Sequence, residues 1–534
     1  MSAPLASIRE LTLALPEGAD RGYAVAEMSF SVRAGEILCI VGESGSGKSV
    51  CAQAMLGLLP MSIRPLHGEI LFDGMDLARF GPAEWRDLRG RRIAMIFQEP
   101  MTALNPSMRV GDQIAEMFEA HDLLDPAGRR RRARELAREV ELPEPDTILR
   151  AFPHQLSGGQ RQRVMIAMAL ALEPSLLIAD EPTTALDVTT QAQILRLIRD
   201  LQGRRGMGVV FITHDFGIVS DIADRVVVLE KGKVVEQGPT AQVLSHPCHP
   251  YTQALLDAVP SRRPAQRPAL RGGELVCEVE HLSKTYVSRT GLFAGRRVVS
   301  AVRDVSFTIR KGETLGLVGE SGSGKSTVAR LVARLLDLDE GRVRLGGTDL
   351  AQLRGRKLRE ARRRVQMVFQ DPFASLNPRR RVGSSIADGP VASGIARKLA
   401  LERARTLLEL VGLDRRAAER LPHEFSGGQR QRIGIARALA LEPSLLVADE
   451  PVSALDVSVQ KQVLDLLEEL KSRLELAMLF ITHDLHVAAK ICDRIAVMSK
   501  GEIVEMKSAT ELFSHPEHPY TKALLAAVPG RARS

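Results

Sequence analysis

The pattern of apolar and polar positions predicts short buried strands that alternate with helices, and this pattern occurs twice along the sequence. Short apolar runs bounded by Gly, Pro or polar turns are typical of strands buried on both faces. We expect such strands at Ile37–Val41, Ser175–Ala179 and Gly208–Thr213, and again at Thr314–Val318, Ser444–Ala448 and Ala477–Thr482. Helices are expected at Ser49–Leu59 and Ser326–Leu336. Strands that alternate with helices predict an α/β fold with a mainly parallel sheet and helices on its faces.

Five segments recur in the same order, which indicates that a whole domain is duplicated. The repeated segments are GESGSGKS at Gly42–Ser49 and Gly319–Ser326, SGGQRQR at Ser157–Arg163 and Ser426–Arg432, ADEP at Ala179–Pro182 and Ala448–Pro451, ITHD at Ile212–Asp215 and Ile481–Asp484, and HPYT at His249–Thr252 and His518–Thr521. From Ser157 and Ser426 onward the copies are 269 residues apart, whereas Lys48 and Lys325 are 277 apart. The halves therefore differ by small insertions ahead of SGGQ.

The boundary between the copies falls in PSRRPAQRPALRGG, whose Pro, Arg and Gly content is typical of a linker. We expect a first domain at 1–259, a linker at 260–273 and a second domain at 274–534. The second domain is expected to open on a strand at Leu275–Val279.

Composition narrows the classes of protein that remain. A hydrophobic fraction of 44% with 26% charged residues is ordinary for a globular protein, and 534 residues are too many for one core. The five cysteines form no CxxC pair, which argues against a disulfide framework and favours a reducing compartment. No apolar run is long enough to cross a bilayer and the N-terminus does not resemble a signal peptide, so we expect a soluble chain that serves a membrane only through other subunits. The net charge of +8 is compatible with nucleic acid, an anionic membrane surface or a solvated surface with phosphate sites.

GxxxxGK[ST] between a buried strand and a helix is the P-loop, in which backbone N–H groups surround phosphates at the positive end of a helix. Lys48 and Lys325 are expected to reach the β- and γ-phosphates, and the hydroxyls of Ser49 and Ser326 to bind Mg²⁺. The expected nucleotide-binding residues of the two loops are Gly42, Glu43, Ser44, Gly45, Ser46, Gly47, Lys48, Ser49 and Val50, and Gly319, Glu320, Ser321, Gly322, Ser323, Gly324, Lys325, Ser326 and Thr327.

An acidic pair ends the next buried strand in each half, as Asp180-Glu181 and Asp449-Glu450. Carboxylates at the end of a buried strand are costly unless something cationic offsets their desolvation. We expect Asp180 and Asp449 to hold Mg²⁺ through water, and Glu181 and Glu450 to polarise the attacking water as catalytic bases.

Two further polar side chains recur at strand ends in both halves. His214 and His483 follow a buried strand in register with the acidic pairs, so we expect them to be catalytic rather than structural. Gln98 in MIFQEP and Gln370 in MVFQDP are expected to sense the γ-phosphate and Mg²⁺.

Ser followed by two glycines at the start of a helix is a second anion-binding N-terminus in each half. The residues of these signatures are Ser157, Gly158, Gly159 and Gln160, and Ser426, Gly427, Gly428 and Gln429. One ATP cannot use both the P-loop and the signature of one domain at this separation. We therefore expect each signature to close over the P-loop of the other half.

Taken in chain order, these motifs resemble those of ABC ATPases over nearly the whole chain: P-loop, Q-loop, signature, Walker B, D-loop (Ala185-Leu186-Asp187 and Ala454-Leu455-Asp456) and H-loop. FQEPMTALNP, FQDPFASLNP, EPTTALD and the closing HPxHPYT are similar to the ATP-binding subunits of oligopeptide, dipeptide and nickel importers. The fused arrangement resembles the single-chain ATPases of the microcin C and glutathione uptake systems.

The resemblance implies two tandem P-loop ABC nucleotide-binding domains. Each would have a mainly parallel core sheet, an antiparallel β subdomain and an α-helical signature subdomain between the Q-loop Gln and SGGQ. It implies ATP and Mg²⁺ as cofactors, with Mg²⁺ near Ser49, Gln98 and Asp180 in one site and near Ser326, Gln370 and Asp449 in the other.

The resemblance also implies a function and partners. ATP hydrolysis would drive uptake of peptides or peptide-like solutes, with one fused chain serving two integral-membrane permease subunits and an extracytoplasmic solute-binding protein. The chain would lie at the cytoplasmic face of the inner membrane and bind no nucleic acid. A short helix of each permease would enter a groove beside the Q-loop, lined within Met101–Pro106 and Phe373–Pro378.

The sequence departs from the family pattern at two places. Tyr286 in LSKTY occupies the position of the aromatic that stacks on adenine, but the matching residue of the first half is Leu15. Tyr23, where the second half has Ser300, is the alternative stacking residue there. Many relatives carry a Cys-rich segment after HPYT that holds an iron–sulfur cluster, and because 254–268 contains no Cys we expect no cluster.

Two other classes of twin ATPase fit the sequence less well. A ribosome-binding protein would suit the basic runs Arg129–Arg134 and Arg354–Arg364, but such proteins carry a long charged helical linker where this chain has fourteen residues. The interspersed acids Glu135, Glu139 and Glu360 also fit solvated helix faces. A DNA-repair ATPase would carry large insertions with zinc-spaced Cys, which this sequence lacks.

Overall fold

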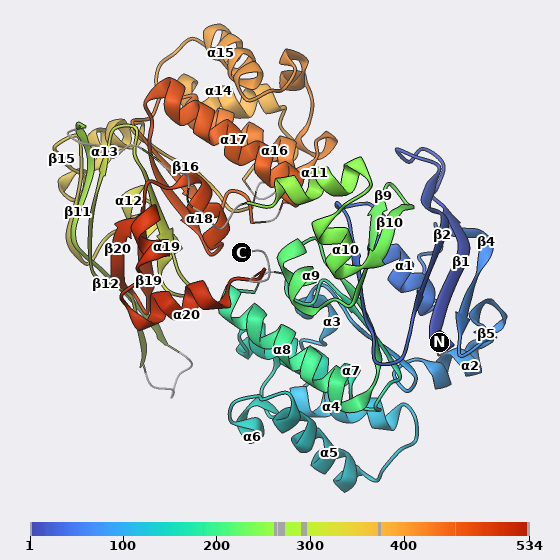
Figure 1. Ribbon diagram of the computed structural model, residues 1–534. Helices are drawn as coiled ribbons and strands as arrows, with labels where there is room; N and C mark the ends of the chain where they lie inside the picture. The colour runs from blue at the N-terminus through green and yellow to red at the C-terminus, as the bar shows by residue number, and fades with distance from the viewer. Residues whose placement is uncertain are drawn as a thin grey trace. The chain divides into compact units, whose positions relative to one another are not determined.

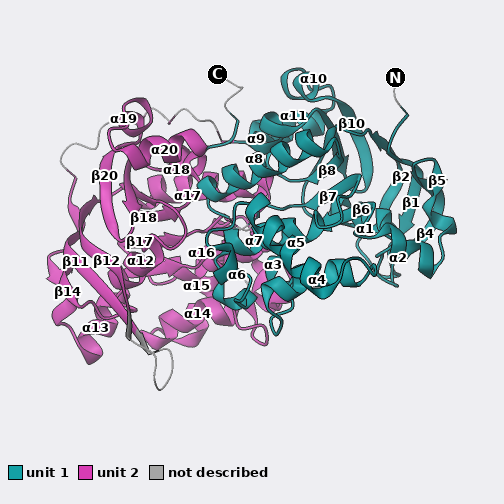
Figure 2. Ribbon diagram, turned by 90° about the horizontal axis from the view of Figure 1, so that it is seen from below, with its two compact units in different colours: residues 1–259, 528–534 teal, residues 260–527 magenta. Residues whose placement is uncertain are grey.

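The computed structural model describes residues 3–184, 186–260, 264, 267, 273–289, 296–371, 375–453 and 455–530. It divides into two compact units, residues 1–259 with 528–534 (unit 1) and residues 260–527 (unit 2), coloured separately in Figure 2. Each unit is described below by itself.

The central layer of unit 1 is a six-stranded sheet, several strands of which are labelled in Figure 2. Its strands, in spatial order, are β10 (Lys233–Pro239), β9 (Arg225–Glu230), β3 (Ile37–Val41), β8 (Gly208–Ile212), β7 (Leu176–Asp180) and β6 (Ile93–Ile96). The five strands from β9 to β6 are parallel, and β10 pairs antiparallel with β9 at the edge. The second sheet is antiparallel, in the order β2 (Tyr23–Val32), β1 (Ala6–Ala14), β4 (Arg64–Phe72) and β5 (Met75–Asp76).

The central sheet separates two hydrophobic cores because side chains alternate along each strand. In β3, Cys39 packs into the core formed with the helices of the signature region, whereas Ile40 packs into the core shared with the antiparallel sheet. The helices of unit 1 are α1 (Lys48–Met55), α2 (Pro82–Leu88), α3 (Pro100–Ala103), α4 (Val110–Glu119), α5 (Pro126–Glu139), α6 (Pro145–Ile148), α7 (Gly158–Ala169), α8 (Val188–Arg205), α9 (Phe216–Ile222), α10 (Thr240–Ser245) and α11 (Pro250–Ala258). Helices α4, α5 and α7 pack on one another and form the signature subdomain (Figure 1).

Unit 2 repeats the plan. Its central sheet has the order β16 (Val365–Val368), β17 (Leu445–Asp449), β18 (Ala477–Thr482), β13 (Thr314–Val318), β19 (Arg494–Ser499) and β20 (Glu502–Ser508), and its antiparallel sheet the order β12 (Arg296–Arg310), β11 (Leu275–Arg289), β14 (Glu340–Leu345) and β15 (Thr348–Asp349). Its helices are α12 (Lys325–Val332), α13 (Gly355–Arg362), α14 (Val382–Ala392), α15 (Arg397–Leu410), α16 (Gly427–Leu439), α17 (Val457–Leu474), α18 (Leu485–Ile491), α19 (Ala509–Ser514) and α20 (Pro519–Ala527). The predicted α/β fold with parallel core, antiparallel subdomain and helical subdomain is therefore confirmed in both halves.

The predicted ends of the two P-loop helices were wrong. The expected helices run to Leu59 and Leu336, whereas α1 ends at Met55 and α12 at Val332. Just beyond each end a residue takes a left-handed backbone, Gly57 at φ +61° and Arg334 at φ +56°, and this conformation terminates a helix. Leucines continue past both stops, so the apolar pattern alone could not locate them.

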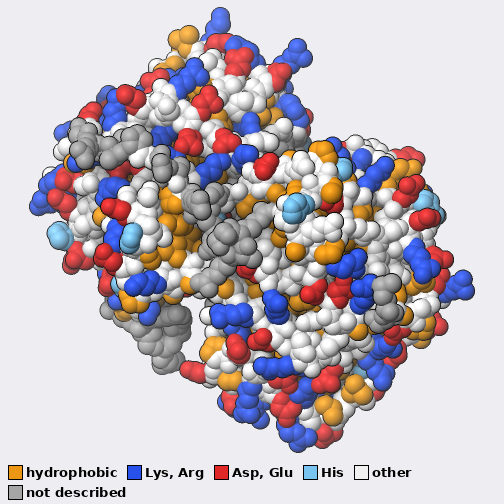
Figure 3. Space-filling model, viewed as in Figure 1, with side chains coloured by type: hydrophobic (Ala, Val, Ile, Leu, Met, Phe, Trp, Pro, Cys, Tyr) orange, Lys and Arg blue, Asp and Glu red, His pale blue; other side chains and the backbone are white. Residues whose placement is uncertain are grey.

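The basic runs lie on ion-paired helix faces. On α5, Arg132 pairs with Glu139 at 2.8 Å and Arg134 with Asp146 at 2.6 Å, and on α13 Arg356 pairs with Glu360 at 2.9 Å. Cationic and anionic side chains are interspersed over the face seen in Figure 3. Within the described residues, no helix is both long enough and apolar enough to cross a membrane.

Candidate nucleotide-binding sites

The P-loop of unit 1 joins β3 to α1 and requires glycine at two closely packed positions. The φ angles of Gly42 and Gly47 are +154° and +104°, and a Cβ there would lie 2.3 Å from the Leu229 carbonyl oxygen or 2.6 Å from that of Ala24. Only glycine tolerates such approaches. Lys48 Nζ donates to the carbonyl oxygens of Gly42 and Glu43 at 2.8 and 2.9 Å, so the ammonium group lies over the loop.

The P-loop of unit 2 has the same construction between β13 and α12. Lys325 Nζ donates to the carbonyl oxygens of Gly319 and Glu320, each at 2.7 Å. Val50 and Thr327, the last expected residues of each loop, are half-buried in the first turn of α1 and α12.

Both loops contain a buried hydroxyl that lacks a partner. The Oγ atoms of Ser46 and Ser323 are buried with no hydrogen-bond partner among the described residues. A buried polar group without a partner is costly, so its presence in both copies calls for an acceptor in the loop. Phosphate oxygens have the chemistry to fill that role at a helix N-terminus.

The first acidic residue of each pair contacts the P-loop serine. Ser49 Oγ donates to Asp180 Oδ1 at 3.1 Å, and Ser326 Oγ to Asp449 Oδ1 at 3.0 Å. Burial raises the pKa of Asp180 and of Asp449, more than the serine hydrogen bonds lower it. A hydroxyl and a carboxylate brought together in this way are hard oxygen ligands of the kind Mg²⁺ prefers.

Glu181 is the centre of a polar network at the carboxyl end of the sheet. His214 Nδ1 lies 3.3 Å from Glu181 Oε1, Gln98 Nε2 donates to Oε2 at 3.0 Å, and the Thr184 hydroxyl donates to Oε2 at 2.9 Å. Burial alone would raise the pKa of Glu181, but His214, Thr184 and Lys48 together lower it to about 2. The carboxylate is thus held ionised, as a base requires.

Unit 2 reproduces this network around Glu450. His483 Nδ1 lies 3.3 Å from Glu450 Oε1, and Gln370 Nε2 donates to Oε2 at 2.8 Å. Burial opposes ionisation of Glu450, yet His483 and Lys325 lower its pKa. Burial likewise disfavours the charged form of His483, but Glu450 stabilises that form and the pKa of His483 is raised.

Both glutamates have a left-handed backbone, Glu181 at φ +45° and Glu450 at φ +47°. Non-glycine residues there carry strain of about 1–3 kcal/mol, which persists only where the surroundings hold it. The Glu181 N–H donates to the Ile212 carbonyl and the Glu450 N–H to that of Ile481, both at 3.0 Å. The sheet itself therefore holds each glutamate in its strained conformation.

The SGGQ serines cap the signature helices α7 and α16. The Gln160 N–H donates to Ser157 Oγ at 3.3 Å, the Ser157 N–H donates back to Gln160 Oε1 at 2.9 Å, and Ser426 and Gln429 form the same capping box. A Cβ at Gly159 would lie 2.6 Å from Thr190, so helix packing requires this glycine.

The first glycine of each signature has no such packing reason. A Cβ at Gly158 or Gly427 would meet only ordinary contacts, at 3.6 Å, with Leu186 or Leu455. Because glycine has no Cβ, an anion can approach the N–H groups at the start of the helix closely, as an anion-binding N-terminus requires.

Comparison with known proteins decides the family. The ABC transporter model matches residues 25–184 and 302–453, and the model of the oligopeptide/dipeptide transporter C-terminal region matches 235–289 and 504–533. The peptidoglycan transport ATP-binding protein of Agrobacterium fabrum is 48% identical, over 98% of this chain and 96% of that protein. The glutathione import ATP-binding proteins of Salmonella choleraesuis and Pectobacterium atrosepticum are each 47% identical, over 99% and 98% of this chain and 90% and 89% of theirs. The chain belongs to the ABC transporter family.

This ABC protein is an ATPase with two nucleotide-binding domains. Its relatives favour the importer interpretation over the ribosomal one. The predicted similarity to fused importer ATPases is confirmed.

The sequence did not reveal the role of the HPYT tyrosines in these ABC domains. The Glu43 N–H donates to Tyr251 Oη at 3.2 Å, and the Glu320 N–H to Tyr520 Oη at 3.1 Å, so α11 and α20 support the P-loops. The contacts span 208 and 200 residues, which no local pattern can anticipate; recurrence of HPYT was the available signal.

A glutamate of the edge strand β10 or β20 holds each HPYT segment in place. Glu236 accepts the N–H groups of Cys248 and His249, and Glu505 accepts those of Glu517 and His518. Burial opposes ionisation of Glu505, but the backbone N–H groups of Glu517 and His518, together with Lys507, lower its pKa to about 2.

The two halves differ where the adenine base is expected. Tyr286 in β11 is 40% exposed and faces Val299 across the ladder. In unit 1, Leu15 packs against the core, while Tyr23, paired with Ala14 at the same end of the sheet, is 48% exposed.

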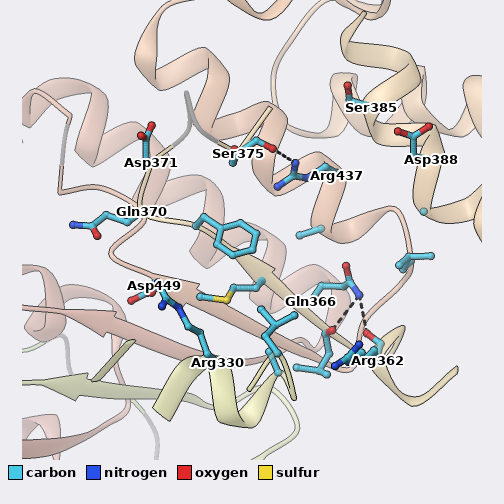
Figure 4. Close-up of a pocket in the computed structure, with 18 of the residues that line it drawn as sticks. Arg330, Arg362, Gln366, Gln370, Asp371, Ser375, Ser385, Asp388, Arg437 and Asp449 are labelled. Atoms are coloured by element: carbon cyan, nitrogen blue, oxygen red, sulfur yellow. Dashed lines mark hydrogen bonds between the residues drawn. The ribbon is translucent and has the colours of Figure 1, made fainter. Parts of the chain in front are cut away.

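A cavity of about 890 Å³ lies beside the Q-loop of unit 2 (Figure 4). Gln370, Ser375 and Asn377 line it, together with residues of α12, α14 and α16. Of the segment Phe373–Pro378 expected here, residues 373 and 374 lie outside the described residues. In unit 1, Met101 of the segment Met101–Pro106 is an exposed residue of α3.

Proposed function

We propose that this chain is the ATP-hydrolysing motor of an importer for peptides or peptide-like solutes. The observation that carries the proposal is the match of both halves to the oligopeptide/dipeptide transporter C-terminal region. Its HPYT tyrosine contacts the P-loop in each half, so the importer-type segment is part of the nucleotide site. The relatives named for glutathione import and peptidoglycan transport support the same class of solute.

In this proposal each half provides one set of catalytic groups. Glu181 and Glu450 accept a proton from the attacking water, His214 and His483 hold them ionised, and Gln98 and Gln370 report the γ-phosphate to the Q-loop. The N–H groups and lysine of each P-loop bind the phosphates, and the two SGGQ helices supply further N–H donors.

Mg²⁺ fits the oxygen ligands that the two sites provide. Ser49, Asp180 and Gln98 would hold it in unit 1, and Ser326, Asp449 and Gln370 in unit 2, with phosphate oxygens and water completing its coordination. When bound, the ion neutralises phosphate charge.

The chain would act at the cytoplasmic face of the inner membrane as a peripheral subunit. Two integral-membrane permeases would form the path for the solute, and an extracytoplasmic solute-binding protein would deliver it. One fused chain, with domains at 1–259 and 274–534 joined by 260–273, would serve one permease pair.

The test is reconstitution of the chain in proteoliposomes with candidate permeases and a solute-binding protein from the same organism. We expect ATP-dependent uptake of labelled glutathione or short peptides, and ATPase activity stimulated by the loaded binding protein. Glu181→Gln/Glu450→Gln is the matched control and should abolish both. Failure to assemble with any permease, with co-sedimentation on ribosomes instead, would contradict the importer.

A further inference from the structure

The cavity beside the Q-loop of unit 2 is rich in arginine. Four arginines line the cavity: Arg330 of α12, Arg362 of α13, Arg380 from the turn before α14 and Arg437 of α16. In Figure 4, Arg437 and Arg330 lie on opposite sides of the space, with Gln370 at one end and Asp388 at the other.

These arginines differ in their carboxylate partners. Arg380 pairs with Asp388 at 2.7 Å, and the exposed Arg330 favours the ionised form of Asp449 electrostatically. In contrast, no described carboxylate lies within ion-pair distance of the half-buried Arg437. Arg437 donates to the Ser375 carbonyl oxygen, and burial lowers its pKa. A partly buried guanidinium without a counter-charge is costly, and it becomes favourable when a carboxylate binds bidentately.

The corresponding positions of unit 1 carry none of these charges. Gln53, Met108 and Met168 are the counterparts of Arg330, Arg380 and Arg437, counted from the P-loop lysine, the Q-loop glutamine and the SGGQ serine respectively. The acids are kept, since Glu99, Glu116 and Asp180 correspond to the cavity residues Asp371, Asp388 and Asp449. At these six positions three cations balance three anions in unit 2, whereas unit 1 has three anions and no cation.

This difference bears on what each half can bind. Methionine adapts its shape to apolar partners, and an excess of carboxylates repels an acidic one. A segment bearing carboxylates is therefore attracted to unit 2 and repelled by unit 1. Both effects contribute to specificity.

We propose that the cavity of unit 2 binds an acidic permease segment between Arg330 and Arg437, and that unit 1 takes an uncharged, apolar segment instead. The inference rests on the proposed function for the identity of the partner. Its consequence is that the two halves dock two different permease segments, so that one fused chain fits its permease pair in a single orientation.

The test uses the full chain and three synthetic helical peptides of one sequence that differ only in carrying Glu, Gln or Lys at three positions on one face. Saturation-transfer NMR detects binding near a Kd of about 1 mM. We expect the Glu peptide to bind about tenfold more tightly than the Gln peptide, and the Lys peptide not to bind.

Variants locate the binding. Arg330→Gln/Arg437→Met, which installs the residues of unit 1, should remove the preference for Glu, whereas Arg437→Lys should retain most of it. Arg356→Gln/Arg359→Gln removes two exposed charges of α13 and should change nothing. Gln53→Arg/Met168→Arg should create a second site for the Glu peptide.

Equal binding of the Glu and Gln peptides, no binding of the Glu peptide, or a preference that survives Arg330→Gln/Arg437→Met would overturn the inference. Thermal unfolding of each variant checks that it folds. Co-purification with the permeases separates the two hypotheses: a chain that assembles with them yet shows no preference for acid refutes the charge inference alone.

Discussion

The side-chain amide of Gln98 donates a hydrogen bond to the carboxylate of Glu181, with 3.0 Å between Nε2 and Oε2. Gln98 lies two residues beyond the end of β6, and Glu181 follows β7 directly, so the contact joins the carboxyl ends of two neighbouring parallel strands. A partner that moves the Q-loop would therefore act on the catalytic carboxylate through one hydrogen bond.

Loss of either catalytic carboxylate should reduce turnover steeply. We expect Glu181→Gln and Glu450→Gln each to lower ATPase turnover by about 10²–10³, because each removes a charged group needed in the transition state. The double variant should still bind ATP. Steady-state phosphate release measures the effect, and unchanged turnover in one single variant would mean that its site does not contribute.

Stability should depend on the ionisation of Glu181. Its folded-state pKa of about 2 lies below the ordinary 4.5, so its contribution is present above about pH 4.5 and is lost as pH falls toward 2. The contribution is on the order of 3 kcal/mol because Glu181 is largely shielded from water. Calorimetry of the wild type and Glu181→Gln should show melting temperatures that converge on acidification, and a constant gap would refute this account.

The asymmetry between Leu15 and Tyr286 should appear in nucleotide affinity. Lys48→Ala leaves the site of unit 2 to be titrated and Lys325→Ala leaves that of unit 1, and we expect weaker ATP binding in the latter. Loss of a base stack is worth roughly 1–3 kcal/mol, so adding Tyr286→Ala to Lys48→Ala should cost that much. Equal affinities of the two sites, with a loss on Tyr23→Ala, would show that Tyr23 supplies the stack in unit 1.

The HPYT tyrosines should matter through their hydroxyl groups. Tyr251→Phe removes the acceptor of the Glu43 N–H and should weaken ATP binding by about 1–3 kcal/mol at that site, as should Tyr520→Phe at the other. Tyr23→Phe is the control, because it keeps the ring. Fluorescent-nucleotide titration gives the affinities, and equal losses in all three variants would argue against a role for the contact.

The composite-site hypothesis can be tested by crosslinking. Ser46→Cys and Gly427→Cys, with Glu181→Gln and Glu450→Gln to trap ATP, should form a disulfide within one chain. Cys248 is exposed and must be replaced, whereas the other four cysteines are buried, which raises the pKa of Cys51 and Cys277 to about 12. A linker of fourteen residues reaches about 20 Å, enough for abutting domains. Crosslinks found only between two chains would instead indicate a domain-exchanged dimer.

The sequence predicted what depends on local pattern and on strand order. Glu181, His214 and Gln98 each follow a buried strand, and parallel strands bring their carboxyl ends to one edge, so their meeting could be predicted. The Tyr251–Glu43 contact was not, because it depends on how α11 returns to the P-loop. The charge difference between Arg437 and Met168 is visible in the sequence, but only the structure shows that Arg437 lines the same cavity as Gln370.

The left-handed backbone at Glu181 and Glu450 sets activity against stability. Glycine at either position would remove the base and its polar contacts. It would also relieve the backbone strain, which offsets part of the stability lost with those contacts. In a twin ATPase that no longer uses one of its sites, replacement of this glutamate with Gly or Asn would therefore relieve backbone strain without loss of activity. Because this chain keeps the strained Glu at both positions, we expect both of its sites to hydrolyse ATP.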